Sequence, residues 1–343
     1  MFTMTEQQQK FFASDHLTSM VQEIDYTADF AIMKYFPIAQ YPDKTLKSEV
    51  TLDTRKIFKD GFKAYRAPAH PIARKERHAK QVTMIPFSLS TDFEETDLLG
   101  QNVALTSDIK QKIEYYLSQY TEYLKKGIDY TLAWANWQIL KTGSFEVSTS
   151  AGITYNADFG IANWQTKELT ANDRWSQYTQ PDSTPLADIE AWRREAHKKG
   201  AGVLKELVMN SATFETFAGH PSVKELMGER FKELAYQGLQ SDITIKGYKI
   251  SLVDDYYEEE DNDTPIHYLA DGEVIAKVDG PLGETALGTT EITDDKGFKT
   301  VFGVFSKSYI TNNPDGLVLV SGMHTLPNLK RRYSFIKVNT EAS

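Results

Sequence analysis

The sequence predicts an α+β protein, and two observations lead to this fold class. A helical pattern of apolar residues runs for about 35 positions in the first half of the chain, and strand patterns separated by Gly and Asp turns stand on both sides of it. Tyr and Trp occupy much of the apolar stripe, where a coiled coil would place Leu at two fixed heptad positions. We therefore expect a long helix that lies across a sheet.

Composition excludes several classes of protein. The 343 residues include no Cys, which excludes disulfides, zinc-thiolate sites and thiol catalysis. The net charge of -10 argues against a protein that mainly grips phosphate backbones. The N-terminus carries no basic start before an apolar run, and no stretch approaches the roughly 18 apolar residues that span a bilayer. We expect an intracellular chain without secretion or membrane insertion.

Residues 1–47 are predicted to form an N-terminal arm. Short amphipathic pieces at 17–24 and 30–36 are broken by Pro37 and Pro42. Such short pieces cannot close a core of their own, so we expect the arm to need a partner on which to pack.

Residues 48–93 predict a long hairpin with a charged tip. A strand pattern with a turn at Asp60-Gly61 is followed by a second strand at 82–93. Two strands alone are marginally stable in water, so the hairpin should lie on another surface. The basic residues of its tip are Arg74, Lys75, Arg77 and Lys80.

Charge is unevenly placed along the chain. Nine Lys and Arg against two acids occur between Arg55 and Lys80, whereas Asp254 to Asp263 holds seven acids and no base. Two solvated loops would explain this. The alternative is that unlike segments meet across subunits, because complementary charge guides association.

Residues 107–142 predict one helix of about 50 Å, at 1.5 Å per residue. Thr106, Ser107 and Asp108 supply N-cap chemistry, Gly127 interrupts the helix, and Gly143 ends it. The segments after it are predicted as strands and loops at 145–179, a helix from Pro185 to Gly200, a strand at 203–209, a short helix from a Ser211 cap to 218, a helix from Pro221 to 227, and strands after 243.

The sequence offers no convincing catalytic or metal motif. The seven histidines form no HExxH pair, and no GxSxG elbow is present. Gly280, Gly283 and Gly288 lack the Lys-Ser/Thr of a phosphate loop, and Asp261-Asn262-Asp263 lacks the glycine and glutamate of an EF-hand. We therefore expect no catalytic residue, metal ligand or cofactor.

Three segments resemble the lambda-type major capsid family of tailed phages. They are the strand with two prolines at Gly61–Pro71, Trp175 with the helix opening Pro185–Ile189, and Glu206–Met209 followed by Phe214 and His220–Val223. The tail at 321–338 is similar in length and placement, but its basic Lys330-Arg331-Arg332 departs from the acidic version expected.

This resemblance implies the Hong Kong 97-type phage capsid fold. Its parts would be the arm at 1–47, the extended E-loop hairpin at 48–93, a peripheral domain with the spine helix at 94–184, an axial domain at 185–311, and closing strands at 312–343. The implied function is a major head protein that self-assembles into the icosahedral or prolate shell around the phage genome.

The resemblance also implies the partners. The chain would meet itself in hexamers and pentamers, a separate scaffolding protein, a portal and a decoration protein, and would enclose double-stranded DNA without reading its sequence. The expected location is the virion, after assembly in the host cytoplasm. An encapsulin-like nanocompartment is the alternative, distinguished by a protein cargo in place of nucleic acid, and a hydrolase with an unrecognised site is a third.

Overall fold

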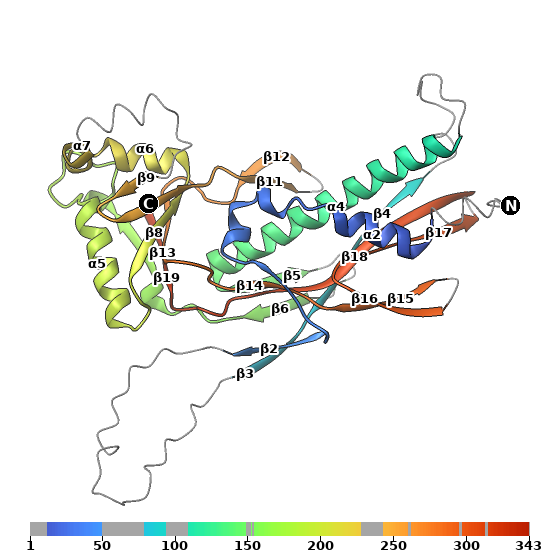
Figure 1. The fold of residues 1–343 in the computed structure, drawn as a ribbon. Helices are drawn as coiled ribbons and strands as arrows, with labels where there is room; N and C mark the ends of the chain where they lie inside the picture. Colours follow the sequence, from blue (N-terminus) through green and yellow to red (C-terminus); the bar gives the residue numbers. More distant parts are fainter. Residues whose placement is uncertain are drawn as a thin grey trace, which may run out of the picture. The chain divides into compact units, whose positions relative to one another are not determined.

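The computed structural model describes residues 12–49, 79–93, 109–148, 152, 154–227, 243–259, 262–294, 297–312 and 315–342. The chain forms two compact units, each built from separate stretches of sequence (Figure 1). The first unit takes residues 1–47, 81–158 and 283–329, and the second takes 48–80, 159–282 and 330–343.

The first unit is built on a mixed five-stranded sheet with β18 (Asp315–Asn328) at its centre. One edge of β18 pairs antiparallel with β17 (Phe305–Asn312) and β14 (Glu284–Leu287), and the other edge pairs with β4 (Ile85–Phe93). Strand β1 (Ile38–Gln40) extends the sheet in parallel beside β14.

The predicted long helix is confirmed as α4 (Ile109–Thr142), which packs along this sheet (Figure 1). The expected interruption at Gly127 is wrong, because α4 continues through this residue. Ile128 and Leu132 pack with Met323 of β18, and Leu124 packs with Leu319. Gly143, at φ 77°, takes the left-handed conformation that ends a helix. The expected cap residues 106–108 lie outside the described residues.

The described part of the arm packs within its own chain, so our expectation that it needs a partner is wrong there. It forms α2 (Ser14–Glu23) and two 3-10 turns, η1 (Thr27–Asp29) and η2 (Ala31–Lys34). Leu17 and Val21 of α2 are fully buried against α4 and the sheet. Short amphipathic pieces are sufficient because the large face of the sheet supplies the missing surface.

Four two-stranded sheets stand beside the larger sheets of the described residues. At the base of the predicted E-loop, β2 (Thr45–Glu49) pairs with β3 (Ala79–Thr83), and residues 50–78 lie outside the described residues. The other two-stranded sheets are β5 (Ser144–Ser148) with β6 (Thr154–Asp158), β11 (Tyr256–Glu259) with β12 (Asn262–His267), and β15 (Thr289–Asp294) with β16 (Gly297–Phe302).

The second unit holds a six-stranded sheet in the order β7-β19-β13-β8-β10-β9. Its strands are β7 (Thr166–Thr170), β8 (Leu204–Met209), β9 (Ile243–Ile245), β10 (Tyr248–Leu252), β13 (Glu273–Val278) and β19 (Phe335–Ala342). Its helices are η4 (Asn163–Gln165), η5 (Ala171–Asp173), α5 (Pro185–Lys198), α6 (Ser211–Gly219) and α7 (Pro221–Met227).

The ends of these helices largely follow the prediction. Pro185 opens α5, and Gly200, at φ 78°, follows its end. The predicted Ser211 cap is wrong, because the Asn210 side chain accepts the N–H of Thr213 at 2.8 Å and Ser211 is already helical. Asn and Ser both favour the N-cap position, so the sequence pattern predicted the cap one residue too late.

Candidate assembly surfaces

The part of the chain that the structure describes contains neither a cluster of metal-ligating side chains nor a membrane-spanning helix. Those residues contain no group of three His, Asp or Glu side chains placed to hold a metal ion. None of their helices is long and apolar enough to cross a membrane. Among the histidines, His16, His197 and His267 are exposed, and His70 and His78 lie outside the described ranges.

The two less exposed histidines have structural roles. The Nδ1 atom of His220 accepts the backbone N–H of Ser222 at 3.3 Å, at the start of α7. His324 lies 2.7 Å from the Thr290 hydroxyl, through its Nδ1 atom. Burial lowers the pKa of both rings, which favours the neutral form that can accept a hydrogen bond.

The structure brings together two segments that carry the family resemblance. The indole N–H of Trp175 donates to the Asp188 carboxylate at 3.0 Å. The Trp175 ring stacks on Trp192 of α5 and packs against Phe217 of α6, with centroids 5.8 and 5.2 Å away. These residues therefore hold α5 and α6 together in the core of the second unit.

The glycines that superficially suggested a phosphate loop serve backbone packing. A Cβ atom on Gly283 would lie 2.1 Å from the carbonyl oxygen of Asn328, and one on Gly288 would lie 2.7 Å from the sulfur of Met84. Gly280 has φ 83°, which favours glycine.

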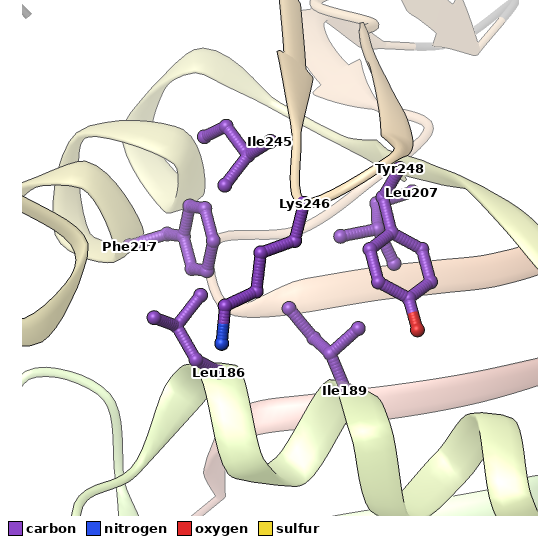
Figure 2. Close-up of a pocket in the computed structure, with 7 residues that line it drawn as sticks. All are labelled: Leu186, Ile189, Leu207, Phe217, Ile245, Lys246 and Tyr248. Atoms are coloured by element: carbon purple, nitrogen blue, oxygen red, sulfur yellow. The ribbon is translucent and has the colours of Figure 1, made fainter. Parts of the chain in front are cut away.

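A small pocket lies in the second unit, beside α5 and the β9–β10 hairpin (Figure 2). Its walls are Leu186, Ile189, Leu207, Phe217, Ile245, Lys246 and Tyr248. Burial raises the pKa of Tyr248 to about 12, and its hydroxyl donates to Glu190 at 3.1 Å. A neutral phenol and one lysine do not supply the nucleophile, base and oxyanion donors of a catalytic site.

Exposed tyrosines follow the outer side of α4. Tyr115, Tyr123 and Tyr130 are each at least half exposed, at spacings that place them along one side of the helix. Glu122 and Lys126 on the same side pair with each other at 2.9 Å, so this surface carries little net charge. Tyr is enriched where proteins meet, which makes the stripe a candidate protein contact. The stripe could not be identified from the sequence, because a helical pattern of apolar residues marks only the buried side of the helix.

The acidic segment lies partly on the β11–β12 hairpin. Glu258 and Glu259 are exposed there, whereas Asp254 accepts the N–H of Ser211 in the first turn of α6, at 2.7 Å. The next acids, Glu260 and Asp261, lie outside the described residues. The exposed pair can bind a surface of opposite charge.

The basic tip falls mostly outside the described ranges. The structure does not describe Arg74, Lys75 and Arg77, so the pairing of the tip with an acidic surface stays a prediction. Lys80 lies in β3, at the base of the predicted E-loop.

The comparisons with known proteins agree with a shell-building role. A sequence model of the phage major capsid protein E family matches residues 13–340. No curated protein sequence matches the chain significantly.

Two solved structures share the fold at low sequence identity. One is a prophage protein of E. coli CFT073 that is described as a capsid protein; it is 15% identical, with a TM-score of 0.62 over 95% of this chain and 98% of that one. The other is a phage-related protein of Bordetella bronchiseptica RB50; it is 12% identical, with a TM-score of 0.50 over 94% of this chain and 96% of that one.

Proposed function

The chain belongs to the phage major capsid protein E family, and from this premise we propose how its copies work together. It is a major capsid protein with the Hong Kong 97-type fold, and many copies form the shell of the virion. An encapsulin-like nanocompartment is not favoured, because the family that matches nearly the whole chain is one of phage capsid proteins.

We propose that hexamers and pentamers close this shell in the host cytoplasm around a separate scaffolding protein, with a portal and a decoration protein as further partners. The chain catalyses no reaction and encloses double-stranded DNA without reading its sequence. The net charge of -10 supports this last point, because a strongly basic lining would hold the packaged DNA in place. The ranges assigned to the arm, the E-loop, and the peripheral and axial domains belong to the same proposal.

The single observation that carries the proposal is the family match over residues 13–340. Expression of the chain with and without its scaffolding protein, followed by negative-stain microscopy and sedimentation, tests it. We expect rings or closed shells. A chain that stays monomeric at every concentration, even with the scaffolding protein, would overturn the assembly proposal, and shells that hold protein cargo in place of nucleic acid would restore the nanocompartment.

We further propose that the basic tip, with Arg74, Lys75, Arg77 and Lys80, pairs with an acidic surface on an adjacent subunit. The exposed Glu258 and Glu259 of the β11–β12 hairpin offer such a surface. Complementary charge of this kind guides the encounter of subunits and fixes their register.

Reversal of the tip charge is the first prediction. The triple variant Arg74→Glu, Lys75→Glu, Arg77→Glu should fold normally, because exposed charges contribute little to stability, yet assemble slowly or not at all. The control reverses three exposed lysines elsewhere, Lys34, Lys205 and Lys224, with the same change in net charge. Circular dichroism and sedimentation at two salt concentrations measure the outcome, and wild-type shells from the tip variant at low salt would reject the pairing.

A further inference from the structure

The β15–β16 hairpin has one face that packs against its own chain. Its two strands pair antiparallel from Thr289 opposite Phe302 to Asp294 opposite Gly297. Ile292 and Val301 turn inward and form a small core with Phe305 and Val320 of the five-stranded sheet. Because successive strand residues point to opposite faces, the residues that flank Ile292 and Val301 along each strand turn outward.

The outer face of the hairpin carries two exposed aromatic rings. Phe298 is 89% exposed and Phe302 is 53% exposed. Thr300 lies between them in β16 and is also exposed. Phe298 is more exposed than any other large apolar side chain of the described residues. Exposed aromatic rings that gather on one face are typical of protein contact surfaces.

The hairpin is held in place by the arm. The side-chain amide of Gln22 donates to the carbonyl oxygens of Phe302 and Val304, at 3.0 and 2.8 Å. Lys299 forms an ion pair with Asp15 of α2. The two rings are therefore presented on a supported surface, which lowers the conformational entropy lost when a partner binds.

Charge on this outer face favours a protein partner. Glu291 is directly opposite Thr300, and its carboxylate lies 3.8 Å from the ammonium group of Lys44. The face therefore offers apolar rings, threonine hydroxyls and a partly compensated acid. A phosphate backbone would need several cations, and the described residues of this face present an acid whose nearby lysine is already engaged.

We propose that the outer face of the β15–β16 hairpin, centred on Phe298 and Phe302, docks on a second copy of this chain. Each subunit of a shell carries one such face, and the partner that is always present in equal number is the chain itself. With each buried Phe contributing about 150 to 250 Å², the face supplies only part of the roughly 800 Å² per partner of a stable interface. It therefore acts as an apolar anchor within a larger contact. This inference rests on the proposed function, because it assigns one contact of the shell.

Removal of the rings tests the contact. The double variant Phe298→Ser, Phe302→Ser should keep the circular dichroism spectrum and thermal transition of the wild type and lose at least ten-fold in shell yield. The matched control Val203→Ser, Leu226→Ser removes two exposed apolar side chains from the second unit and should assemble normally. Normal shells from the phenylalanine variant, or equal losses from both variants, would overturn the proposal.

A cross-linking experiment identifies the partner. The chain has no cysteine, so Thr300→Cys provides a single attachment point for a photoreactive maleimide in complete particles. We expect a covalent dimer of the chain after irradiation of shells and none after irradiation of dissociated subunits. Cross-links to a scaffolding protein or to DNA, or no cross-links in intact shells, would overturn the assignment of a second copy while leaving the shell-building function unaffected.

Discussion

Asp188 and Glu206 are acids in the second unit whose partners differ in charge. The carboxylate of Asp188 accepts from the neutral indole of Trp175, at 3.0 Å. Glu206 of β8 accepts from the ammonium group of Lys277 in β13, at 2.6 Å, and Lys277 is almost completely buried. A cation thus compensates the ionised carboxylate of Glu206. The carboxylate of Asp188 accepts hydrogen bonds from neutral groups.

Asp188 should make stability depend on pH. Burial raises the pKa of Asp188 in the folded chain above its usual value of about 3.9, so protonation favours the fold at acidic pH. This contribution is lost as the pH rises through the folded pKa. Asp188→Asn keeps an oxygen for Trp175 but cannot ionise, so wild type should lose stability relative to the variant as the pH rises.

Urea unfolding from about pH 4 to about pH 7 measures this difference. The exposed Asp182→Asn provides the control, since it removes an acid near the same helix without touching Trp175. A difference between wild type and Asp188→Asn that stays constant or reverses its sign would contradict the assignment.

The Lys277–Glu206 pair should behave as a unit. Lys277→Met removes the buried cation that pairs with Glu206, which should cost about 3 to 5 kcal/mol in the free energy of unfolding. The double variant Lys277→Met, Glu206→Met replaces both charges with apolar groups of similar size, so it should recover much of that loss. Urea unfolding of the single and double variants gives the interaction energy between the two side chains. Additive losses of unfolding free energy would show that they contribute independently.

At the scale of elements, α4 depends on its buried face. Ile128 is fully buried between the arm and the sheet. Ile128→Asp places an unpaired charge there and should cost several kcal/mol of a stability of about 5 to 15 kcal/mol, giving insoluble or unfolded protein. Tyr123→Asp, at a position that is 70% exposed on the same helix, should stay soluble. Soluble yield and circular dichroism compare the two, and equal behaviour would mean that the buried face is misassigned.

Local signals explain which elements could be predicted. The ends of α4 and α5 depend on Gly143, Pro185 and Gly200, whose effects act within a few residues, so the sequence indicates them directly. The pairing of β18 with β4 joins positions such as Val320 and Ser90 that are far apart in the chain. No local pattern specifies such a partner, and for the same reason the docking of the arm on the sheet could not be predicted.

The assembly surfaces were harder to predict than the fold. Tyr123 on α4 and Phe298 in β16 belong to residue types that also fill cores, and only the packed structure shows that they are exposed. Charge could be read from the sequence at the basic tip and at Glu258 and Glu259, because charged side chains rarely lie buried without partners. Complementary apolar surfaces on neighbouring copies leave no comparable pattern.

At the scale of the whole molecule, assembly should raise thermal stability. Neighbouring subunits bind the folded chain and not the unfolded chain. At a subunit concentration a hundred-fold above the dissociation constant, this binding adds about 2.7 kcal/mol to the free energy of unfolding. Calorimetry should give a higher Tm for shells than for dissociated subunits, and the Tm of a mixture should rise with protein concentration. A Tm that is identical for both forms at all concentrations would contradict stabilisation by assembly.

The central position of β18 has a consequence for the order of events during synthesis. Strand β4 ends at Phe93, but the strand that covers its edge begins at Asp315. At about 5 to 20 residues per second, a ribosome takes roughly ten to forty-five seconds to make the intervening chain. During that time β4 and α4 are exposed without the strand against which both pack, so a nascent chain cannot yet present a finished first unit. The first unit can therefore offer its finished surfaces to other copies only after β18 has emerged.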